Sequence, residues 1–564
     1  MRKILLALVA LSGIVLQPAS AKTCTWTNAT GDYCWDTSGN WDGGLPGESD
    51  VAKFTEVGIE KEKSILLAQD VTVSNLEIST SFVFKFAPVA DATPVLAVGG
   101  VKTDCTGAKA NVYVDVNVPV RLRAMLGPEP LEVPPAETNC EWNVTGWPGI
   151  SLNKAVSKEL NDVKLYKTGS GELRLNYAEM KLADAVVVRQ GVLNANAKHS
   201  IQGIFVVGGG DESAQLKTVK EAFYNATPYV YTNGYASIFA DAQSTAPNNY
   251  HVYEGGKIYE YGVRSCKFVL QGGRIWGGKF TRGGSTQGIA ALESGLMSVF
   301  DAEMDIVQSS YSMTINVSDG PRAVDLLVTK RFCGYDAWNS TKNRNFKKDG
   351  KGTLMTLADM ASSLAIPVYV AAGRWIVDNP TCRGLGGKTC YVQTGAILSG
   401  TGFLGGTEDS ANANVSVEGK SSGPAILAPG SFSTNDNSRI FGRLTVGSED
   451  QANSVSFKNQ SRLEIGLGLH GQHDSLYVYG PVTVSQQSGH VTELRVTLPF
   501  GWEKTKGGQY EILTATEGIS GPFKTVTCVD ADGNPEPRVK VTYSDDMKSV
   551  YATVAGKGLT IIVR

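Results

Sequence analysis

Short runs in which hydrophobic and polar residues alternate recur along the 564-residue chain. Residues 112–116 (VYVDV), 475–479 (SLYVY) and 539–543 (VKVTY) are examples, and they are rich in β-branched and aromatic side chains. Alternation of this kind is typical of strands with one buried face, and clusters of Gly, Asn, Asp and Ser separate many of the runs. The pattern therefore predicts an all-β protein.

One segment fits a helix better than a strand. Leu216, Val219 and Phe223 follow the spacing of one helix face, and Asp211 or Ser213 precedes them as a candidate cap. We expect a short helical insert at this point of the chain.

An internal repeat narrows the fold class. Residues 167–175 (KTGSGELRL) and 348–354 (KDGKGTL) both match K-x-G-x-G-x-L, and about 20 residues later another glycine, Gly191 or Gly373, opens a further hydrophobic run. Two strands and two turns of this length cannot bury their own hydrophobic face, so they have to stack on copies of themselves in a solenoid. The glycines suit tight corners with positive φ.

Three stretches resemble the autotransporter-associated β-strand repeat proteins. One is the pair of K-x-G-x-G-x-L units, and another is an opening segment W…W…NW…P…D-x-A-x-F, carried by Trp26, Trp35, Asn40, Trp41, Pro46, Asp50, Ala52 and Phe54. The third is the C-terminal third of the chain, with matching segments at 394–402, 427–430, 442–446, 473–478, 510–513 and 519–523. The resemblance implies a right-handed parallel β-helix of the passenger type. We expect no translocating barrel, whose repeated strands of about ten alternating residues have no counterpart here.

The N-terminus has the pattern of an export signal. Arg2 and Lys3 precede an apolar run over residues 4–16, and residues 19–21 (ASA) form a cleavage site of small residues. The run is shorter than the roughly 20 residues that span a bilayer, and no later stretch is long enough to do so. We expect a secreted or cell-surface protein whose mature chain has no transmembrane segment.

The expected organisation has four parts. These are a signal peptide (1–21), a Trp-rich N-terminal cap segment (22–55), a β-solenoid (56–500) with an irregular insert around 205–345, and a small C-terminal β module (501–564). Charged residues are 19% of the chain, with 52 Lys and Arg against 55 Asp and Glu, so nothing in the charge favours nucleic acid as a partner.

The nine cysteines can oxidise in an exported protein. Their spacing suggests local staples between Cys24 and Cys34 and between Cys382 and Cys390, and a longer link between Cys105 and Cys140, although spacing does not fix connectivity. An odd count leaves at least one free thiol, for which Cys528 is the candidate.

An acidic cluster in the middle region is one candidate site. Asp301, Glu303 and Asp305 alternate along a predicted strand, so they share one face. They are candidates for a Ca²⁺ site or for an acid and base pair. The alternative is a solvated outer face.

Basic and aromatic residues upstream form two further candidates. Residues 264–282 hold no acidic residue and include Arg264, Lys267, Arg274, Trp276 and Phe280, a pattern suited to an anionic glycan with aromatic stacking. Tyr259 and Tyr261 share a strand face that suits sugar binding. The alternatives are solubilising charge and a structural tyrosine ladder.

Two function classes follow. We favour a non-enzymatic exported β-solenoid, adhesive or structural, whose partner is an extracellular polysaccharide or a cell-surface glycan. The alternative is a polysaccharide lyase or glycoside hydrolase, in which the acidic cluster holds Ca²⁺ or acts as acid and base, and a basic residue binds or deprotonates an acidic sugar. Catalysis requires the carboxylates and a basic residue to converge on one concave face.

Overall fold

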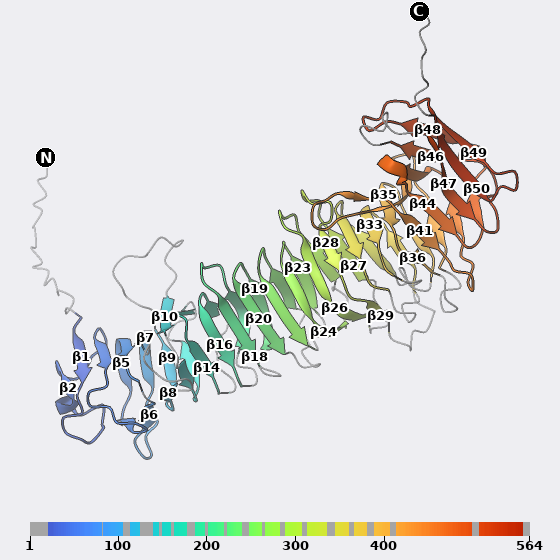
Figure 1. Cartoon of the computed structure of the whole chain (residues 1–564). Coiled ribbons are helices and arrows are strands. Elements are labelled where there is room, and N and C mark those ends of the chain that lie inside the picture. Colours follow the sequence, from blue (N-terminus) through green and yellow to red (C-terminus); the bar gives the residue numbers. More distant parts are fainter. Residues whose placement is uncertain are drawn as a thin grey trace, which may run out of the picture. The chain divides into compact units, whose positions relative to one another are not determined.

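The architecture comes from a computed structural model (Figure 1). It describes residues 21–81, 83–104, 113–123, 139–145, 149–158, 163–177, 186–197, 201–218, 223–239, 248–261, 266–282, 288–306, 313–334, 345–359, 366–380, 388–405, 413–498 and 507–555. The chain divides into an N-terminal unit, residues 1–173, and a C-terminal unit, residues 174–564. The described residues contain strands and short 3₁₀ turns such as Ser38–Asn40 and Leu469–Gly471, and no α-helix. The prediction of an all-β fold is confirmed.

The N-terminal unit is a stack of parallel strands. Its strands are β1 (Thr23–Trp26), β2 (Trp41–Asp42), β3 (Val51–Phe54), β4 (Ser64–Leu67), β5 (Val71–Ile78), β6 (Lys85–Pro88), β7 (Leu96–Asp104), β8 (Tyr113–Val116), β9 (Val120–Leu122), β10 (Asn139–Thr145), β11 (Gly149–Leu152), β12 (Val156–Lys158) and β13 (Lys164–Thr168). One ladder runs β1–β3–β5–β7, and another runs β4–β6–β8–β11. β2 is antiparallel to β1.

Aromatic side chains fill the core of the first coils. Trp26, Trp35 and Phe54 are fully buried. The ring of Trp41 lies 5.1 Å from that of Trp26 and 4.8 Å from that of Trp35, in edge-to-face contacts. The tryptophans of the predicted cap segment are therefore core residues, each removing a large apolar surface from water.

The C-terminal unit is also built from stacked parallel strands. Sheet A consists of β15 (Val186–Val188), β17 (Ile201–Val207), β19 (Phe223–Val230), β21 (Asn248–Val252), β23 (Cys266–Leu270), β25 (Gly288–Ala291), β27 (Met313–Val317), β30 (Phe346–Asp349), β32 (Val368–Val370), β34 (Cys390–Val392), β37 (Val415–Val417), β42 (Val455–Phe457) and β45 (Val482–Val484), each parallel to the next. At alternate positions of these strands, side chains such as Val and Ile point into the core. Burial of this face fixes the register in which neighbouring strands pair.

Sheet B is the second wall of the same coils. Its strands are β16 (Gly191–Ala195), β18 (Ala214–Thr218), β20 (Gly234–Phe239), β22 (Lys257–Tyr261), β24 (Arg274–Arg282), β26 (Ser298–Ile306), β28 (Leu326–Val328), β29 (Phe332–Gly334), β31 (Thr353–Thr356), β33 (Gly373–Val377), β35 (Ala396–Gly400), β38 (Ala425–Pro429), β43 (Ser461–Gly466), β46 (Thr492–Thr497) and β48 (Thr525–Val529). β14 (Glu172–Leu175) spans the boundary between the units. The stacking of parallel strands in successive coils confirms a parallel β-helix.

A third sheet and a hairpin complete the C-terminal unit. Sheet C contains β36 (Phe403–Leu404), β41 (Arg443–Val446), β44 (Ser475–Val478) and β47 (Gly508–Ala515) in parallel, followed by antiparallel β50 (Ser549–Val554) and β49 (Val539–Tyr543). The hairpin β39 (Ser431–Phe432) and β40 (Arg439–Ile440) places Phe432 against a cluster of Val324, Leu327, Met355 and Ile376. The strands among residues 507–555 therefore continue sheets B and C.

The helix predicted around Leu216 is wrong. Residues 214–218 form strand β18, and Phe223 begins β19. Ala214 and Leu216 are fully buried, while Gln215 and Lys217 face outward, so burial alternates along the strand. Parallel pairing with β16 and β20 supplies hydrogen-bond partners for the backbone of this strand. This tertiary pairing decides the structure, although three side chains have the spacing of a helix face. The described strands between residues 205 and 345, where an irregular insert was expected, follow the same coil pattern.

The glycines of the repeat turn the chain at corners of the coil. Gly169 and Gly350, at the same position of the two copies, have φ values of 73° and 77°. A Cβ at Gly350 would lie 2.3 Å from the carbonyl oxygen of Val317, and one at Gly169 would lie 2.5 Å from that of Val144. Both positions therefore require glycine, as the repeat predicted.

The lysine of each repeat copy lies inside the solenoid. Lys167 and Lys348 are fully buried. Their ammonium groups donate hydrogen bonds to backbone carbonyls, Lys167 to Thr168 (2.8 Å) and Gly169 (2.6 Å), and Lys348 to Gly350 (2.7 Å), Gly352 (2.6 Å) and Ala372 (2.8 Å). Burial lowers the pKa of Lys167 to about 7 and that of Lys348 to about 8. In both copies the buried ammonium group therefore donates hydrogen bonds to the carbonyls of the corner.

The predicted staple between Cys24 and Cys34 is wrong, because both thiols are free. The Cys24 Sγ is buried, 3.8 Å from the carbonyl oxygen of Gly43, whereas Cys34 lies in a bridge with Leu66. Because alternate side chains of β1 point into the core, the thiol of Cys24 is directed inward, away from that of Cys34.

Two thiols of the C-terminal unit are also free. Cys390 is a buried thiol on β34, so the expected link to Cys382 is not formed, and Cys528 on β48 is free as expected. Cys105, Cys382 and the side chain of Cys140 lie outside the described residues.

Candidate functional site

The outward face of sheet B brings together several residues that the sequence singled out. Tyr259 on β22, Trp276 on β24 and Asp301 on β26 occupy the same register position on three successive strands. Arg274 lies two residues before Trp276 and Glu303 two residues after Asp301, so they face the same side. We call these five residues the sheet B cluster.

The charged groups of the sheet B cluster pair with their neighbours. Arg274 Nη2 lies 2.5 Å from Asp301 Oδ2, and Arg331 Nε lies 3.0 Å from Glu303 Oε1. The Thr329 hydroxyl donates a hydrogen bond to the other oxygen of Asp301. Burial, the largest single influence, raises the pKa of Asp301, but hydrogen bonds from Thr329 and Arg274 together outweigh it and leave the pKa below its usual value. Both carboxylates are thus used in ionic contacts between coils.

The aromatic rings of the sheet B cluster also contact their neighbours. The Trp276 ring lies 6.1 Å from that of Tyr259, edge to face, and 5.6 Å from that of Tyr235, stacked. The Arg274 guanidinium lies 5.9 Å from the centre of the Trp276 ring. This arrangement joins cation, carboxylate and aromatic rings into one network across successive coils.

Other predicted site residues do not join the sheet B cluster. Lys267 is exposed on β23, which belongs to sheet A, whereas Arg274 lies on β24 of sheet B, so these two basic residues do not share a face. The cause is that the turn between β23 and β24 separates two walls of the coil. Arg264 lies outside the described residues, as do the side chains of Tyr261, Phe280 and Asp305.

The Ca²⁺ hypothesis finds no support in the described side chains. Among them, no group of three or more His, Cys, Asp or Glu residues is placed to hold a metal ion. Asp301 and Glu303 each face an arginine, and a cation there would have to displace it.

Stacked rings run along the outward face of sheet A. Tyr229 and His251 stack with centroids 4.5 Å apart and ring planes 2° from parallel, and Tyr231 and Tyr253 stack at 4.4 Å and 3°. Burial, and to a smaller extent the charge of Lys267, lowers the pKa of His251, so its ring is neutral at pH 7. The two near-parallel pairs span the same two coils, two residues apart along the chain, and together form a flat aromatic surface.

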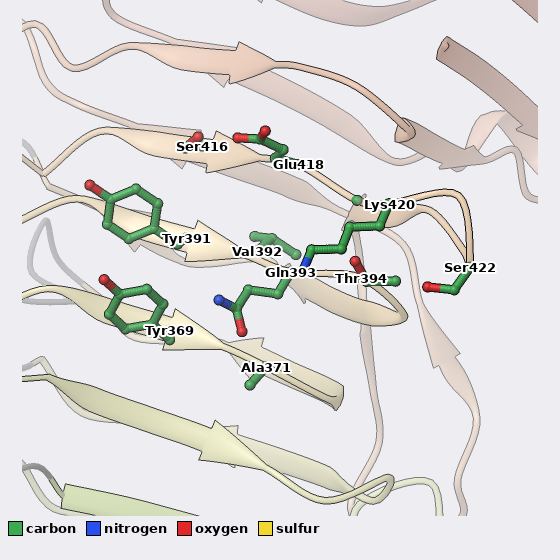
Figure 2. Close-up of a pocket in the computed structure, with 11 residues that line it drawn as sticks. Tyr369, Ala371, Tyr391, Val392, Gln393, Thr394, Ser416, Glu418, Lys420 and Ser422 are labelled. Carbon is green, nitrogen blue, oxygen red and sulfur yellow. The ribbon is translucent and has the colours of Figure 1, made fainter. Parts of the chain in front are cut away.

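A groove farther along sheet A carries a second stacked pair. Tyr369 on β32 and Tyr391 on β34 occupy matching register positions, with ring centroids 5.0 Å apart and planes 18° from parallel. The groove has a volume of about 480 Å³. It is lined by Tyr369, Ala371, Tyr391, Val392, Gln393, Thr394, Ser416, Glu418, Gly419, Lys420 and Ser422 (Figure 2).

Polar groups surround the tyrosine pair. Ser416 on β37 continues the register column of the two tyrosines and is only 7% exposed, yet its hydroxyl has no hydrogen-bond partner among the described residues. Glu418 Oε2 lies 3.4 Å from Lys458 Nζ. Figure 2 shows the Lys420 side chain extending over the groove toward Gln393 and Thr394. The groove thus combines a flat apolar floor with several hydrogen-bonding groups, the usual composition of a small-ligand site.

The groove was missed by sequence reasoning, although a signal for it exists. Tyr369 and Tyr391 stand in the triplets V-Y-V (368–370) and C-Y-V (390–392), one coil apart, and Ser416 stands in V-S-V (415–417). Only the coil register shows that these central residues lie side by side.

Comparison of the sequence with protein families and with curated proteins finds no match. The chain matches no protein family, and no curated protein is significantly similar to it in sequence. In the described part of the chain, no helix has the length and hydrophobicity that crossing a bilayer requires. What the fold establishes is a parallel β-solenoid with aromatic pairs on its outward faces.

Proposed function

We propose that this protein is an exported, non-enzymatic β-solenoid that binds glycans as an adhesive or surface component. The observation that carries the proposal is the Tyr369–Tyr391 pair in its groove. Stacked, half-buried rings present a flat apolar surface of the kind on which the C–H face of a pyranose packs. The surrounding Gln393 and Thr394 supply groups that hydrogen-bond sugar hydroxyls.

Repetition along sheet A supports binding to a polymer. The pairs Tyr229–His251 and Tyr231–Tyr253 lie on strands β19 and β21 or directly after them, and a register ladder leads from β21 through β23, β25, β27 and β30 to β32 at the groove. At ~4.8 Å per strand, β21 and β32 are roughly 24 Å apart. A glycan chain that reaches two platforms gains affinity through effective concentration without stronger individual contacts.

Export and family membership belong to the same proposal. The leader pattern of residues 1–21 supports secretion or cell-surface display, and the K-x-G-x-G-x-L units support descent from autotransporter-associated repeat passengers. The enzymatic alternative rested on the sheet B carboxylates, and the pairing of Asp301 and Glu303 with arginines weakens that argument.

The test is binding of the purified protein to a panel of neutral and acidic polysaccharides by affinity electrophoresis and biolayer interferometry. The double variant Tyr369→Ala/Tyr391→Ala should lose most of the binding, and Tyr177→Ala, which changes an exposed tyrosine (41% exposed) elsewhere in the C-terminal unit, should retain it. Circular dichroism and thermal melting check that each variant is folded. No binding to any member of the panel, or equal binding by the double variant, would overturn the proposal.

A further inference from the structure

We infer that the groove takes an anionic sugar, a uronic acid residue of a polysaccharide, with its ring on the tyrosine pair and its carboxylate against the Lys420 ammonium. This inference rests on the proposed function and specifies the ligand class for the same groove. It follows from three observations: the balance of charge, the position of Lys420, and the hydroxyl of Ser416.

Of the charged residues around the groove, Lys420 is the cation that no described carboxylate pairs with. Glu418, the carboxylate that lines it, is ion-paired with Lys458 at 3.4 Å. Lys347, which precedes Tyr369 in the same register column, is ion-paired with Asp349 at 2.6 Å. Among the described residues, no carboxylate lies within ion-pair distance of Lys420, so the groove carries a net positive charge at its rim.

The backbone of Lys420 is fixed. Its amide donates to the carbonyl oxygen of Gly423 (3.3 Å), and the Gly423 amide donates back (2.9 Å), which closes a tight turn. A Cβ at the preceding Gly419 would lie 2.5 Å from the carbonyl oxygen of Gln460, so the turn packs closely on the next coil. Because its backbone is already fixed, only the side chain of Lys420, which extends over the groove, has to become ordered when it meets an anion there (Figure 2).

Ser416 supplies the independent observation. Its hydroxyl is buried and has no partner in the part of the chain that the structure describes, and such a group is costly to leave unsatisfied. The serine lines the groove beside Tyr391, where a sugar hydroxyl or ring oxygen would satisfy it. A uronate seated on the tyrosines thus completes the hydrogen bonding of Ser416 and neutralises Lys420.

The experiment uses polygalacturonate, alginate and hyaluronan, each beside its carboxyl-reduced form, and a neutral panel of mannan, xylan and β-glucan. Binding is measured at 50 and 500 mM NaCl for the unmodified protein, Lys420→Gln, Lys420→Arg and Tyr369→Ala/Tyr391→Ala. We expect at least one uronate polymer to bind, with about tenfold weaker binding after carboxyl reduction. Lys420→Gln should weaken binding about fivefold and reduce its salt dependence, while Lys420→Arg should retain both.

The outcomes separate the two claims. If only neutral polymers bind, or if carboxyl reduction and Lys420→Gln leave uronate binding unchanged, the inference is overturned and the proposed function stands. If neither panel binds, the proposed function fails and the inference fails with it. Loss of binding in Lys420→Arg as severe as in Lys420→Gln, in a folded protein, would also contradict a role for the charge.

Discussion

Two outward faces of the C-terminal unit have similar residues and different chemistry. The sheet B cluster combines Trp276 with Arg274 and Asp301, and the groove on sheet A combines Tyr391 with Lys420 and Ser416. In the sheet B cluster the guanidinium contacts both the carboxylate and the indole ring. In the groove the serine hydroxyl lacks a partner among the described residues, and the lysine extends over open space.

The difference shows that residue type alone does not identify a binding face. On adjacent parallel strands, the arginine contacts both the aspartate and the tryptophan, because the coil register brings them within contact distance. The groove residues come from three strands and the segments that follow them, and the lining carboxylate, Glu418, is paired with Lys458. A ligand gains more from groups that are still available than from groups that already have protein partners.

The largest expected effect is a loss of stability in the solenoid that supports both faces. Gly350→Ala places a Cβ 2.3 Å from the Val317 carbonyl oxygen at a φ of 77°, so we expect a loss of roughly 3 kcal/mol or more in unfolding free energy. Gly489→Ala is the matched control, since its φ is 79° and a Cβ there meets nothing within 4 Å. It should cost about 1 kcal/mol. Urea denaturation measures both, and equal losses would show that strain in φ, rather than the close approach of coils, fixes this corner.

The next effect separates the two faces by ligand binding. Tyr391→Ala removes half of the stacked pair in the groove, and we expect about tenfold weaker glycan binding, which corresponds to about 1.4 kcal/mol. Trp276→Ala removes the larger aromatic ring of the sheet B cluster and should leave binding within twofold. Biolayer interferometry with the polymer that binds best measures both variants. If Trp276→Ala weakened binding more than Tyr391→Ala, the glycan site would lie on sheet B, and the proposed difference between the two faces would be wrong.

The sequence predicted the solenoid better than it predicted the site. Gly169 and Gly350 could be assigned to corners because only glycine tolerates that geometry, and such a local constraint is visible in a repeat. The burial of Lys348 was not predicted, since its neighbours in the sequence give no sign that backbone carbonyls surround its ammonium. The groove depends on which residues of different coils share a column, and loop lengths between strands vary, so spacing along the chain does not give that register.

A smaller effect tests whether the sheet B cluster stabilises the fold. Asp301→Asn removes the ion pair with Arg274, and we expect a loss of about 1 kcal/mol at pH 7 because the pair is partly exposed. The folded-state pKa of Asp301 lies below its usual value, so its contribution is present above pH 4 and is lost as the pH falls through the folded pKa. The difference in melting temperature between the two proteins should therefore shrink toward zero in acid. Asp450→Asn, at an exposed carboxylate, serves as the control, and a pH-independent difference for Asp301→Asn would show that the charge is not the cause.

The smallest expected effect has opposite signs for stability and binding. Ser416→Ala removes a hydroxyl that has no partner among the described residues, so the unliganded protein should be unchanged or stabilised by a few tenths of a kcal/mol. Glycan binding should weaken about threefold, because the bound sugar loses one hydrogen bond. Thr329→Ala is the comparison on sheet B, since its hydroxyl donates to Asp301, and it should destabilise the protein without changing binding. Calorimetry and interferometry on the same preparations check both signs. A destabilised Ser416→Ala would mean that the hydroxyl already has a structural role in the free protein, and it would remove the strongest contrast between the groove and the sheet B cluster.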